Sequence, residues 1–215
     1  MHDDDLAYLK NFPQLEELWI QNSPATDKGI GYLTVLSNLK RLIVKNVQVT
    51  DAGYAVLQEL RTLELLSLRD RGAANEFRTG IGDAGLAYVA TLPALKNLDL
   101  GGSRVTDSGL SQLKTLANLE VLDLSGTRVR GDGLAELRGL HNLRQLGFKD
   151  NELSAAGVDA LSRMTSLALV QLQGSKIAPA DLLRLQAAIP SARLKLTEAE
   201  SAQVIPEVEQ HSASR

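Results

Sequence analysis

Two aspartates in this sequence are placed where paired carboxylates could act together. Asp99 and Asp123 lie 24 positions apart, and each occurs in a Leu-Asp-Leu segment. If the two segments are neighbouring strands, the carboxylates lie about 4.8 Å apart and repel each other. Such a pair could bind a metal cation, attract a basic group of a partner, or hold one proton between its members. The alternative is that Leu-Asp-Leu is an ordinary segment of a repeated sequence, copied by duplication.

Other residues with catalytic chemistry are few. The chain of 215 residues contains no cysteine, which excludes a disulfide, a thiolate nucleophile and a cysteine-ligated zinc site. His2 and His211 are in terminal segments, His141 is in a turn, and no spacing joins any of them to a serine or an acidic residue. We therefore expect no enzyme, no cofactor and no metal site. Asp99 and Asp123 are only a weak candidate pair for binding a metal ion.

The elements that must position these residues follow from a repeat with a period of 24 positions. The segment 119–129 shows it most cleanly, with apolar residues at offsets 0, 3, 5 and 10. The units begin at Leu15, Leu39, Leu63, Leu95, Leu119, Leu143 and Leu167. This is a leucine-rich-repeat pattern, in which every unit contributes a short strand and then a helix. We expect an α/β fold, namely a right-handed solenoid or horseshoe with a parallel β-sheet on the concave face and helices on the convex face. Strands are expected near Leu18, Leu42, Leu66, Leu98, Leu122, Leu146, Val170 and Leu194.

Each unit also has polar residues with structural tasks. An aspartate recurs where the helix begins, as in Asp27 and Asp107, and we expect it or the preceding threonine to accept the unpaired N–H groups of that helix. A glycine two positions later, as in Gly29 and Gly109, should permit close approach of neighbouring turns.

The unit L-x-x-L-x-L-x-x-S/T-x-V-T-D-x-G-L-x-x-L-x-x-L resembles the ribonuclease-inhibitor-like and cysteine-containing leucine-rich repeats, most closely their short bacterial versions, including those of GALA-type effectors. The resemblance extends from Asp3 to Leu196 and implies a protein-binding role. Some members carry an upstream F-box, but residues 1–14 do not match one. The chain also departs from the cysteine-containing pattern at the positions where Cys or Asn usually turns the chain, of which only Asn151 keeps a usual residue: Ser23, Val47, Ser103, Thr127, Asn151 and Ser175.

The repeat divides the chain into three parts. Residues 1–14 are expected to be a partial repeat or an N-terminal cap, because Leu6, Leu9 and Phe12 lie 24 positions before apolar residues of the first full unit. Residues 15–196 form the repeat domain, with seven units and a final strand. Residues 197–215 are rich in Ser, Ala and Glu and form a C-terminal tail that could be disordered.

Composition narrows the function further. The net charge of -3 and the sequence pI of about 5.7 leave no basic field for nucleic acid or anionic lipid. No apolar run is long enough to span a bilayer, and the first residues do not resemble a signal peptide. We expect no membrane insertion. A cytoplasmic location is favoured for the chain as given, and secretion is the alternative if an upstream signal was removed.

The residues that vary on the concave face are the candidates for partner recognition. Trp19, Ile43 and Leu65 are expected to form a contiguous exposed apolar patch, with Glu17, Arg41, Lys45 and Arg69 around it. Aromatic and arginine side chains are typical of interface hot spots. The competing interpretation is that upstream repeats or the end cap cover this patch.

An insertion lies beside the patch. The third unit is longer than the others, because the segment 69–80 is inserted into it. The segment carries Arg69, Arg71, Phe77 and Arg78, and insertions in repeat proteins often map to the binding face. A tolerated surface loop without a function is the alternative.

The sequence therefore predicts a module that binds another protein on its concave face, at Glu17, Trp19, Arg41, Ile43, Lys45, Leu65, Arg69, Arg71, Phe77 and Arg78. Two other functions stay open. One is an architectural segment of a larger protein with no binding site of its own. The other is a carbohydrate-binding or enzymatic domain, which would need a deep pocket.

Overall fold

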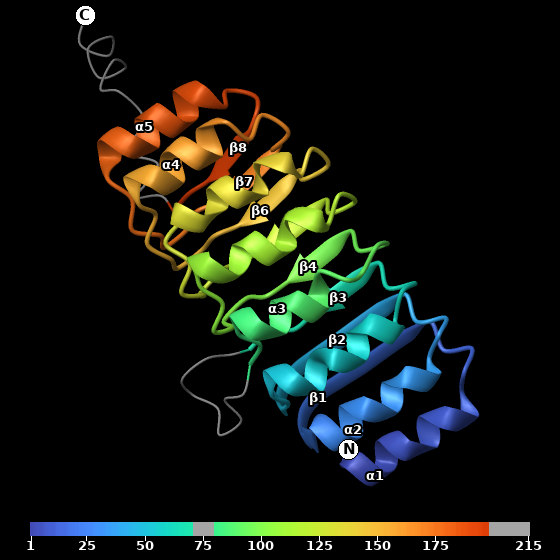
Figure 1. The fold of residues 1–215 in the computed structure, drawn as a ribbon. Helices are drawn as coiled ribbons and strands as arrows, with labels where there is room; N and C mark the ends of the chain where they lie inside the picture. Colours follow the sequence, from blue (N-terminus) through green and yellow to red (C-terminus); the bar gives the residue numbers. More distant parts are fainter. Residues whose placement is uncertain (71–79, 198–215) are drawn as a thin grey trace, which may run out of the picture.

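Eight strands form one parallel sheet in a computed structural model that describes residues 1–70 and 80–197. They are β1 (Glu17–Thr26), β2 (Arg41–Gln48), β3 (Leu65–Ser67), β4 (Asn97–Asp99), β5 (Val121–Asp123), β6 (Gln145–Gly147), β7 (Leu169–Gln171) and β8 (Arg193–Lys195). The strands follow one another across the sheet in the order of the sequence. Figure 1 shows helices stacked along one side of the sheet, and each strand from β1 to β7 is followed by a helical segment of the same unit.

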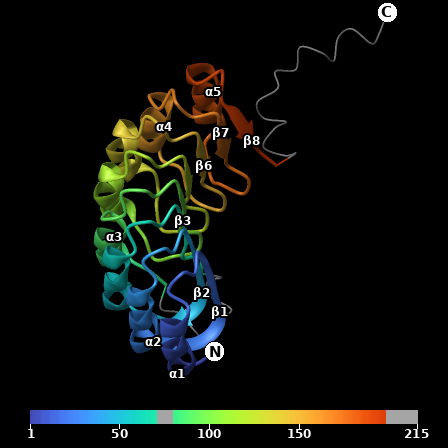
Figure 2. The same ribbon diagram turned by 90° about the vertical axis from the view of Figure 1, so that its right-hand side faces the viewer.

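The helical segments are α1 (Asp3–Leu6), η1 (Ala7–Asn11), α2 (Asp27–Gly31), η2 (Tyr32–Val35), η3 (Asp51–Glu59), α3 (Asp83–Val89), η4 (Asp107–Thr115), η5 (Asp132–Gly139), α4 (Ala155–Ser162) and α5 (Pro179–Ala188), where η marks a 3₁₀ helix. Apolar residues spaced by three, such as Leu110 and Leu113, suit a 3₁₀ helix, because its side chains at positions i and i+3 are eclipsed. Figure 2 shows the helices along the convex side and the strands along the concave side.

The register of the sheet confirms the expected strand centres. Leu18 pairs with Leu42, Leu42 with Leu66, and the pairing continues at the same offset to Val170 and Leu194. These leucines point into one continuous apolar core between the sheet and the helices, in which Leu98 and Leu122 are almost fully buried. The outward residue of each unit therefore lies beside the outward residue of the next.

The recurrent aspartates have a different task from the one expected. Thr26, Thr106 and Ser154 accept the N–H groups at the starts of their own helices. Asp83 instead accepts hydrogen bonds from the backbone N–H and the hydroxyl of Thr106 in the next unit, at 2.8 and 2.6 Å. The expectation that the threonine or the aspartate caps its own helix is confirmed for Thr26 and Thr106, whereas the Asp83 carboxylate is directed to the next layer of the stack. These aspartates tie neighbouring units together.

The recurrent glycine makes room for this link. A Cβ atom on Gly109 would lie 2.3 Å from the Asp83 Oδ1 atom, which no side chain can tolerate. The same relation holds between Gly53 and Asp27, at 2.2 Å. The expected packing role of the glycine is confirmed.

The first two strands are longer than the others. β1 has 10 residues and β2 has 8, whereas each later strand has 3. Both long strands contain an asparagine with a positive φ, and the Asn46 amide donates a hydrogen bond of 2.8 Å to the Asn22 side chain. Pairing resumes beyond them at Ser23 and Val47. The N-terminal end of the concave face therefore carries a longer piece of sheet, which is interrupted at the two asparagines and shifts in register between Ser23 and Thr26.

Residues 1–14 contribute the helical half of a unit. Asp3 of α1 accepts hydrogen bonds from the backbone N–H and the hydroxyl of Thr26, at 2.8 and 2.6 Å, which is the same link that joins the later units. These hydrogen bonds lower the pKa of Asp3 below its usual value. Leu6 is fully buried against the first full unit. Of the expected tail, only Thr197 lies within the described residues.

Candidate partner-binding surface

The exposed aromatic side chain of the concave face is Trp19 on β1. It is 57% exposed, and its indole Nε1 donates a hydrogen bond of 2.6 Å to the Glu17 carboxylate. The Arg41 guanidinium lies 3.7 Å from the other oxygen of the same carboxylate. Glu17 therefore orients the indole ring through a hydrogen bond and makes only a long ionic contact with Arg41 at the surface.

The rest of the expected apolar patch is less exposed than the sequence suggested. Ile43 is only 8% exposed, so the prediction that it forms a contiguous exposed patch with Trp19 is wrong. It lies between Trp19 and Ser67 in the sheet register but is not part of the main core cluster, so we infer that neighbouring side chains on the concave face cover it. Leu65 and Lys45 are half-buried. We call Glu17, Trp19, Arg41, Lys45 and Leu65 the Trp19 patch.

The two aspartates singled out by their spacing lie side by side, as the register predicts, but they are already occupied. Asp99 pairs with Asp123 across β4 and β5. The Arg69 guanidinium donates to both carboxylates, through Nε to Asp99 at 3.1 Å and through Nη2 to Asp123. The basic group that the pair attracts is therefore a side chain of the same molecule. We call these three residues the Arg69 cluster.

Further hydrogen bonds fix both carboxylates. Asp99 accepts from the Ser67 hydroxyl at 2.9 Å and from the Gly101 N–H at 3.0 Å. Asp123 accepts from the Ser125 N–H at 2.9 Å. Partial burial lowers the pKa of Arg69, but the charges of Asp99 and Asp123 and the hydrogen bonds to them outweigh this effect and leave the pKa raised. The guanidinium stays protonated, and the cluster is closed on itself.

Two glycines make the space for this cluster. A Cβ atom on Gly101 would lie 2.6 Å from the Arg69 Cζ atom, and one on Gly147 would lie 2.4 Å from the Asp123 Oδ1 atom. Neither glycine has a positive φ, so the requirement here is room for the side chains above them. The outward face of the sheet is therefore shaped around the ion pairs.

The insertion begins and ends at one place. A Cβ atom on Gly80 would lie 2.8 Å from the Asp70 carboxylate, so the two ends of the inserted segment are adjacent. The Arg104 guanidinium donates to the Gly80 carbonyl at 2.8 Å and holds the returning end. The candidate residues Arg71, Phe77 and Arg78 lie outside the described residues. The remaining residue of the insertion that was assigned to the partner site, Arg69, is directed to the two aspartates.

The Arg69 cluster was missed in the sequence although a signal for it existed. Arg69 lies two positions beyond Ser67, which pairs with Asp99 in the register. It is thus a diagonal neighbour of Asp99, at a distance that a long side chain spans. From the sequence, Arg69 was placed in the partner-binding patch, and Asp99 and Asp123 were considered as a separate pair of carboxylates.

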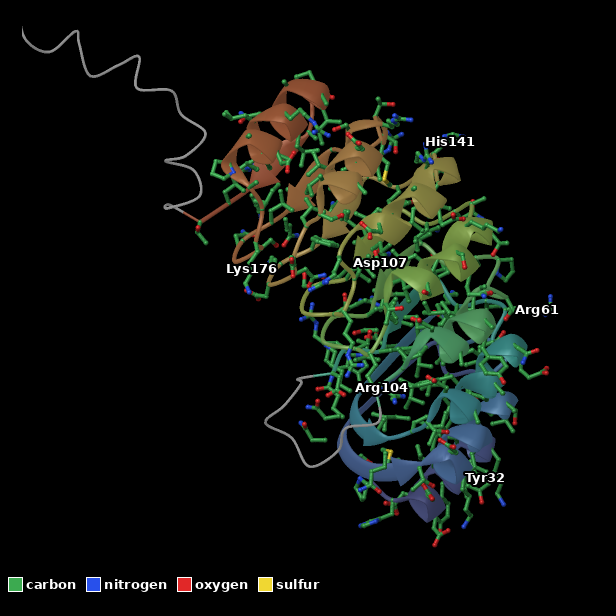
Figure 3. All side chains as sticks on the ribbon, turned by 60° about the vertical axis from the view of Figure 1, so that its left-hand side comes forward. Tyr32, Arg61, Arg104, Asp107, His141 and Lys176 are labelled. Carbon is green, nitrogen blue, oxygen red and sulfur yellow. The ribbon has the colours of Figure 1, made fainter. Side chains whose placement is uncertain are left out.

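The surface offers open hollows where the strands end. One, of about 470 Å³, is lined by Arg69, Asp70, Gly102, Asp123, Ser125, Gly126, Lys149 and Asp150. Another, of about 350 Å³, includes Arg128, Arg130, Glu152 and Lys176 in its lining. Figure 3 shows Arg104 and Lys176 along this side of the solenoid and His141 on the opposite side.

Within the described residues, no three His, Cys, Asp or Glu side chains are grouped so as to hold a metal ion. The same part of the chain contains no helix long and apolar enough to cross a membrane.

Comparisons with solved structures identify the fold. A leucine-rich-repeat protein of Leptospira interrogans superposes with a TM-score of 0.62 and 17% identity, over 88% of this chain and 50% of that one. An internalin of Listeria monocytogenes gives a TM-score of 0.60 and 20% identity, over 89% of this chain and 56% of that one. The chain thus spans about half the length of these structures. No protein-family model and no curated protein matches the sequence.

Proposed function

We propose that this chain, an α/β leucine-rich-repeat solenoid, binds another protein through the Trp19 patch on its concave face. The observation that carries the proposal is Trp19 itself. A large aromatic side chain that is 57% exposed and oriented by Glu17 supplies contact area at a low cost in conformational entropy. A binding role without catalysis also suits the open hollows of the surface, since a deep and enclosed pocket is typical of small-molecule sites.

The charges of the patch complement the aromatic ring. Arg41 keeps only a long contact of 3.7 Å with Glu17. Its remaining N–H groups can therefore pair with a carboxylate or a carbonyl of the partner. Arg69 differs from Arg41, because its guanidinium already pairs with Asp99 through Nε and with Asp123 through Nη2. We therefore centre the proposed site on Trp19 and Arg41 and assign Arg69 a structural role.

The proposal can be tested by site-specific crosslinking followed by titration. A photoreactive phenylalanine analogue is introduced at Lys45, inside the patch, and in a second variant at the exposed Gln112 on the convex face. A protein from the organism's extract that crosslinks only through position 45 is identified by mass spectrometry and purified. Calorimetric titration of that protein then measures its affinity for the unmodified chain and for single variants.

The expected outcome is specific to the N-terminal end. Trp19→Ala and Arg41→Ala should each weaken binding about tenfold, which corresponds to about 1.4 kcal/mol. Lys149→Ala is the matched control, because Lys149 is a cation on the concave side of the later units, and it should change affinity less than about twofold. Equal affinities of the Trp19→Ala variant and the unmodified chain would refute the proposal.

The architectural alternative has one observation in its favour, since the chain covers only about half of each matched structure. A segment with that role would show no preference between the two crosslinking positions. The same experiment therefore separates the two functions.

A further inference from the structure

The two edges of the sheet arrange their charges in different ways. At the edge where the strands begin, the residues directly before β1 to β6 alternate in sign along the stack: Glu16, Lys40, Glu64, Lys96, Glu120 and Arg144. Lys40 pairs with Glu16, and Lys96 pairs with Glu64, both at 2.8 Å. This edge neutralises its own charge.

The edge where the strands end carries a row in which cations predominate. Four charged residues hold the same place in successive units, 24 positions apart: Arg104, Arg128, Glu152 and Lys176. The Arg128 N–H donates to the Val105 carbonyl at 3.0 Å, which sets Arg128 beside Arg104 in the stack. Neighbouring places are about 4.8 Å apart, and like charges so placed are destabilising. Figure 3 shows the two ends of the row, Arg104 and Lys176, on one side of the solenoid.

The anion of this row is already paired. Glu152 accepts a hydrogen bond of 2.9 Å from Nη2 of Arg130, which lies two positions beyond Arg128. Among residues 1–70 and 80–197, no carboxylate forms an ion pair with Arg128 or Lys176, and both residues are exposed. We call Arg128, Arg130 and Lys176 the basic rim. Its charge is not balanced by the rest of the described chain, in contrast to the charge of the opposite edge.

The backbone beneath the basic rim is held in place. The Asn151 amide donates to the Thr127 hydroxyl at 3.2 Å and to the Val129 carbonyl at 3.1 Å, on either side of Arg128. Asn151 is only 6% exposed, so these hydrogen bonds are sheltered from water. A rigid backbone presents its cations in fixed positions and lowers the entropy cost of binding a ligand.

The basic rim borders an open hollow of about 350 Å³. Its lining contains three cations and two anions, which gives it a charge of +1, whereas the whole chain has -3. We propose that the basic rim binds an acidic, extended segment of another protein. Carboxylates of that segment pair with Arg128 and Lys176, and the Arg130–Glu152 pair lies between them.

Two features favour a protein segment over a polymer of phosphates. Arg128 and Lys176 are two units apart, about 10 Å along the stack. Alternate side chains of an extended segment share one face at a spacing of about 7 Å, and the long side chains of the rim cover the difference. In addition, Asp150 and Glu152 in the lining repel a dense row of phosphates, but Asp150 can accept N–H groups of a peptide.

This inference goes beyond the function proposed above. The basic rim belongs to the units that begin at Leu119 and Leu167, whereas the Trp19 patch lies on β1, β2 and β3. The two surfaces can therefore be tested separately.

Fluorescence anisotropy of a labelled peptide tests the inference. The peptide alternates Glu and Gly, and it is titrated with the full chain at low ionic strength. We expect a dissociation constant below about 100 µM that rises as salt is added. A matched peptide that alternates Gln and Gly should not bind. Absence of binding by the Glu peptide overturns the proposal.

Variants of exposed residues locate the contact. Arg128→Gln combined with Lys176→Gln should weaken binding of the Glu peptide at least about tenfold, and thermal unfolding checks that the variant is folded. Arg61→Gln is the matched control, because Arg61 is an exposed arginine on the other side of the solenoid (Figure 3), and it should change affinity less than about twofold. Equal weakening by this control would mean that charge acts diffusely and would overturn the assignment to the rim.

A gain of affinity gives a test that loss of folding cannot imitate. Glu152→Gln removes an anion from the hollow and releases Arg130, so it should tighten binding about threefold. Trp19→Ala should leave affinity for the Glu peptide unchanged, which separates this surface from the Trp19 patch. Unchanged or weaker binding by the Glu152→Gln variant contradicts the proposed pairing.

Two further probes distinguish other occupants. A single-stranded oligonucleotide that binds as tightly as the Glu peptide would assign the rim to polyanions in general and overturn the proposal. A synthetic peptide of residues 198–215, which contain four glutamates, provides the second probe. If it binds more tightly than the Glu peptide, the occupant is the chain's own C-terminal segment, and the assignment to another protein is wrong.

Discussion

The N-terminal end and the centre of the concave face are built from the same positions of the repeat and differ in what their charges do. At the centre, Arg69 pairs with Asp99 and Asp123, and hydrogen bonds from the backbone complete both carboxylates. At the N-terminal end, Glu17 orients Trp19 and makes only a long contact to Arg41, and the ring stays exposed. The charges of the centre are paired with one another, whereas at the end the Trp19 ring is exposed and Arg41 makes only a long ionic contact. Charge on a concave surface therefore indicates a binding site only where the chain has not already paired it.

The largest expected effect is a loss of stability when a core leucine is shortened, and it should be larger at the centre of the sheet than at its N-terminal end. Leu122 is fully buried and has a paired strand on each side, so Leu122→Ala should destabilise the fold by about 2–5 kcal/mol. Leu18 occupies the same position in β1 but has a paired strand on one side only. Leu18→Ala should therefore be less destabilising. Urea unfolding of both variants measures the difference, and equal losses would contradict the contrast in packing.

The second prediction breaks the central cluster. Arg69→Met leaves two adjacent carboxylates without their cation and should lower the free energy of unfolding by about 1 kcal/mol, a small value because the Arg69 side chain is 38% exposed and water screens the pairs. Urea unfolding at neutral pH provides the measurement.

A compensating change supplies the control for that experiment. Adding Asp123→Asn to Arg69→Met removes one of the two like charges and should restore part of the stability at neutral pH. If the double variant is no more stable than Arg69→Met, repulsion between Asp99 and Asp123 is not what the guanidinium relieves.

The third prediction concerns acid sensitivity at the N-terminal end. The folded-state pKa of Asp3 is lowered by its hydrogen bonds with Thr26, so this link contributes stability above the usual value of 3.8 and loses it as the pH falls through the lowered pKa. The amide resonance of Thr26, followed by NMR during acid titration, should shift with a midpoint below 3.8. Asp3→Asn should abolish that titration step. A midpoint at or above 3.8 would mean that the carboxylate is not bound as described.

The smallest expected effect is on the stability of the Trp19 variant. Trp19→Ala removes an exposed side chain from the surface and should change the free energy of unfolding by less than about 0.5 kcal/mol. Urea unfolding should therefore show a smaller loss of stability for Trp19→Ala than for Arg69→Met, which should affect stability more than binding. A loss above about 1 kcal/mol would mean that the ring packs within the fold, and that the N-terminal end resembles the centre.

The sequence by itself was enough to predict the scaffold. The regular spacing of the repeat placed Leu18, Leu42 and Leu66 at the inward positions of neighbouring strands, and the sheet has that register. It also placed Asp99 beside Asp123 on two neighbouring strands. These features follow from the sequence because every unit has the same core and the same backbone hydrogen bonds, so one period describes them all.

The tertiary structure decided which side chains are free. Ile43 and Trp19 occupy equivalent positions, yet one is covered and the other exposed, because β2 has a strand on each side and β1 has only one. Arg69 turns toward Asp99 and Asp123 because Gly101 and Gly147 leave room above the sheet for the side chains that meet there. Such outcomes depend on diagonal neighbours and on the space between them. A period along the chain specifies the positions but not the contacts that long side chains make across them.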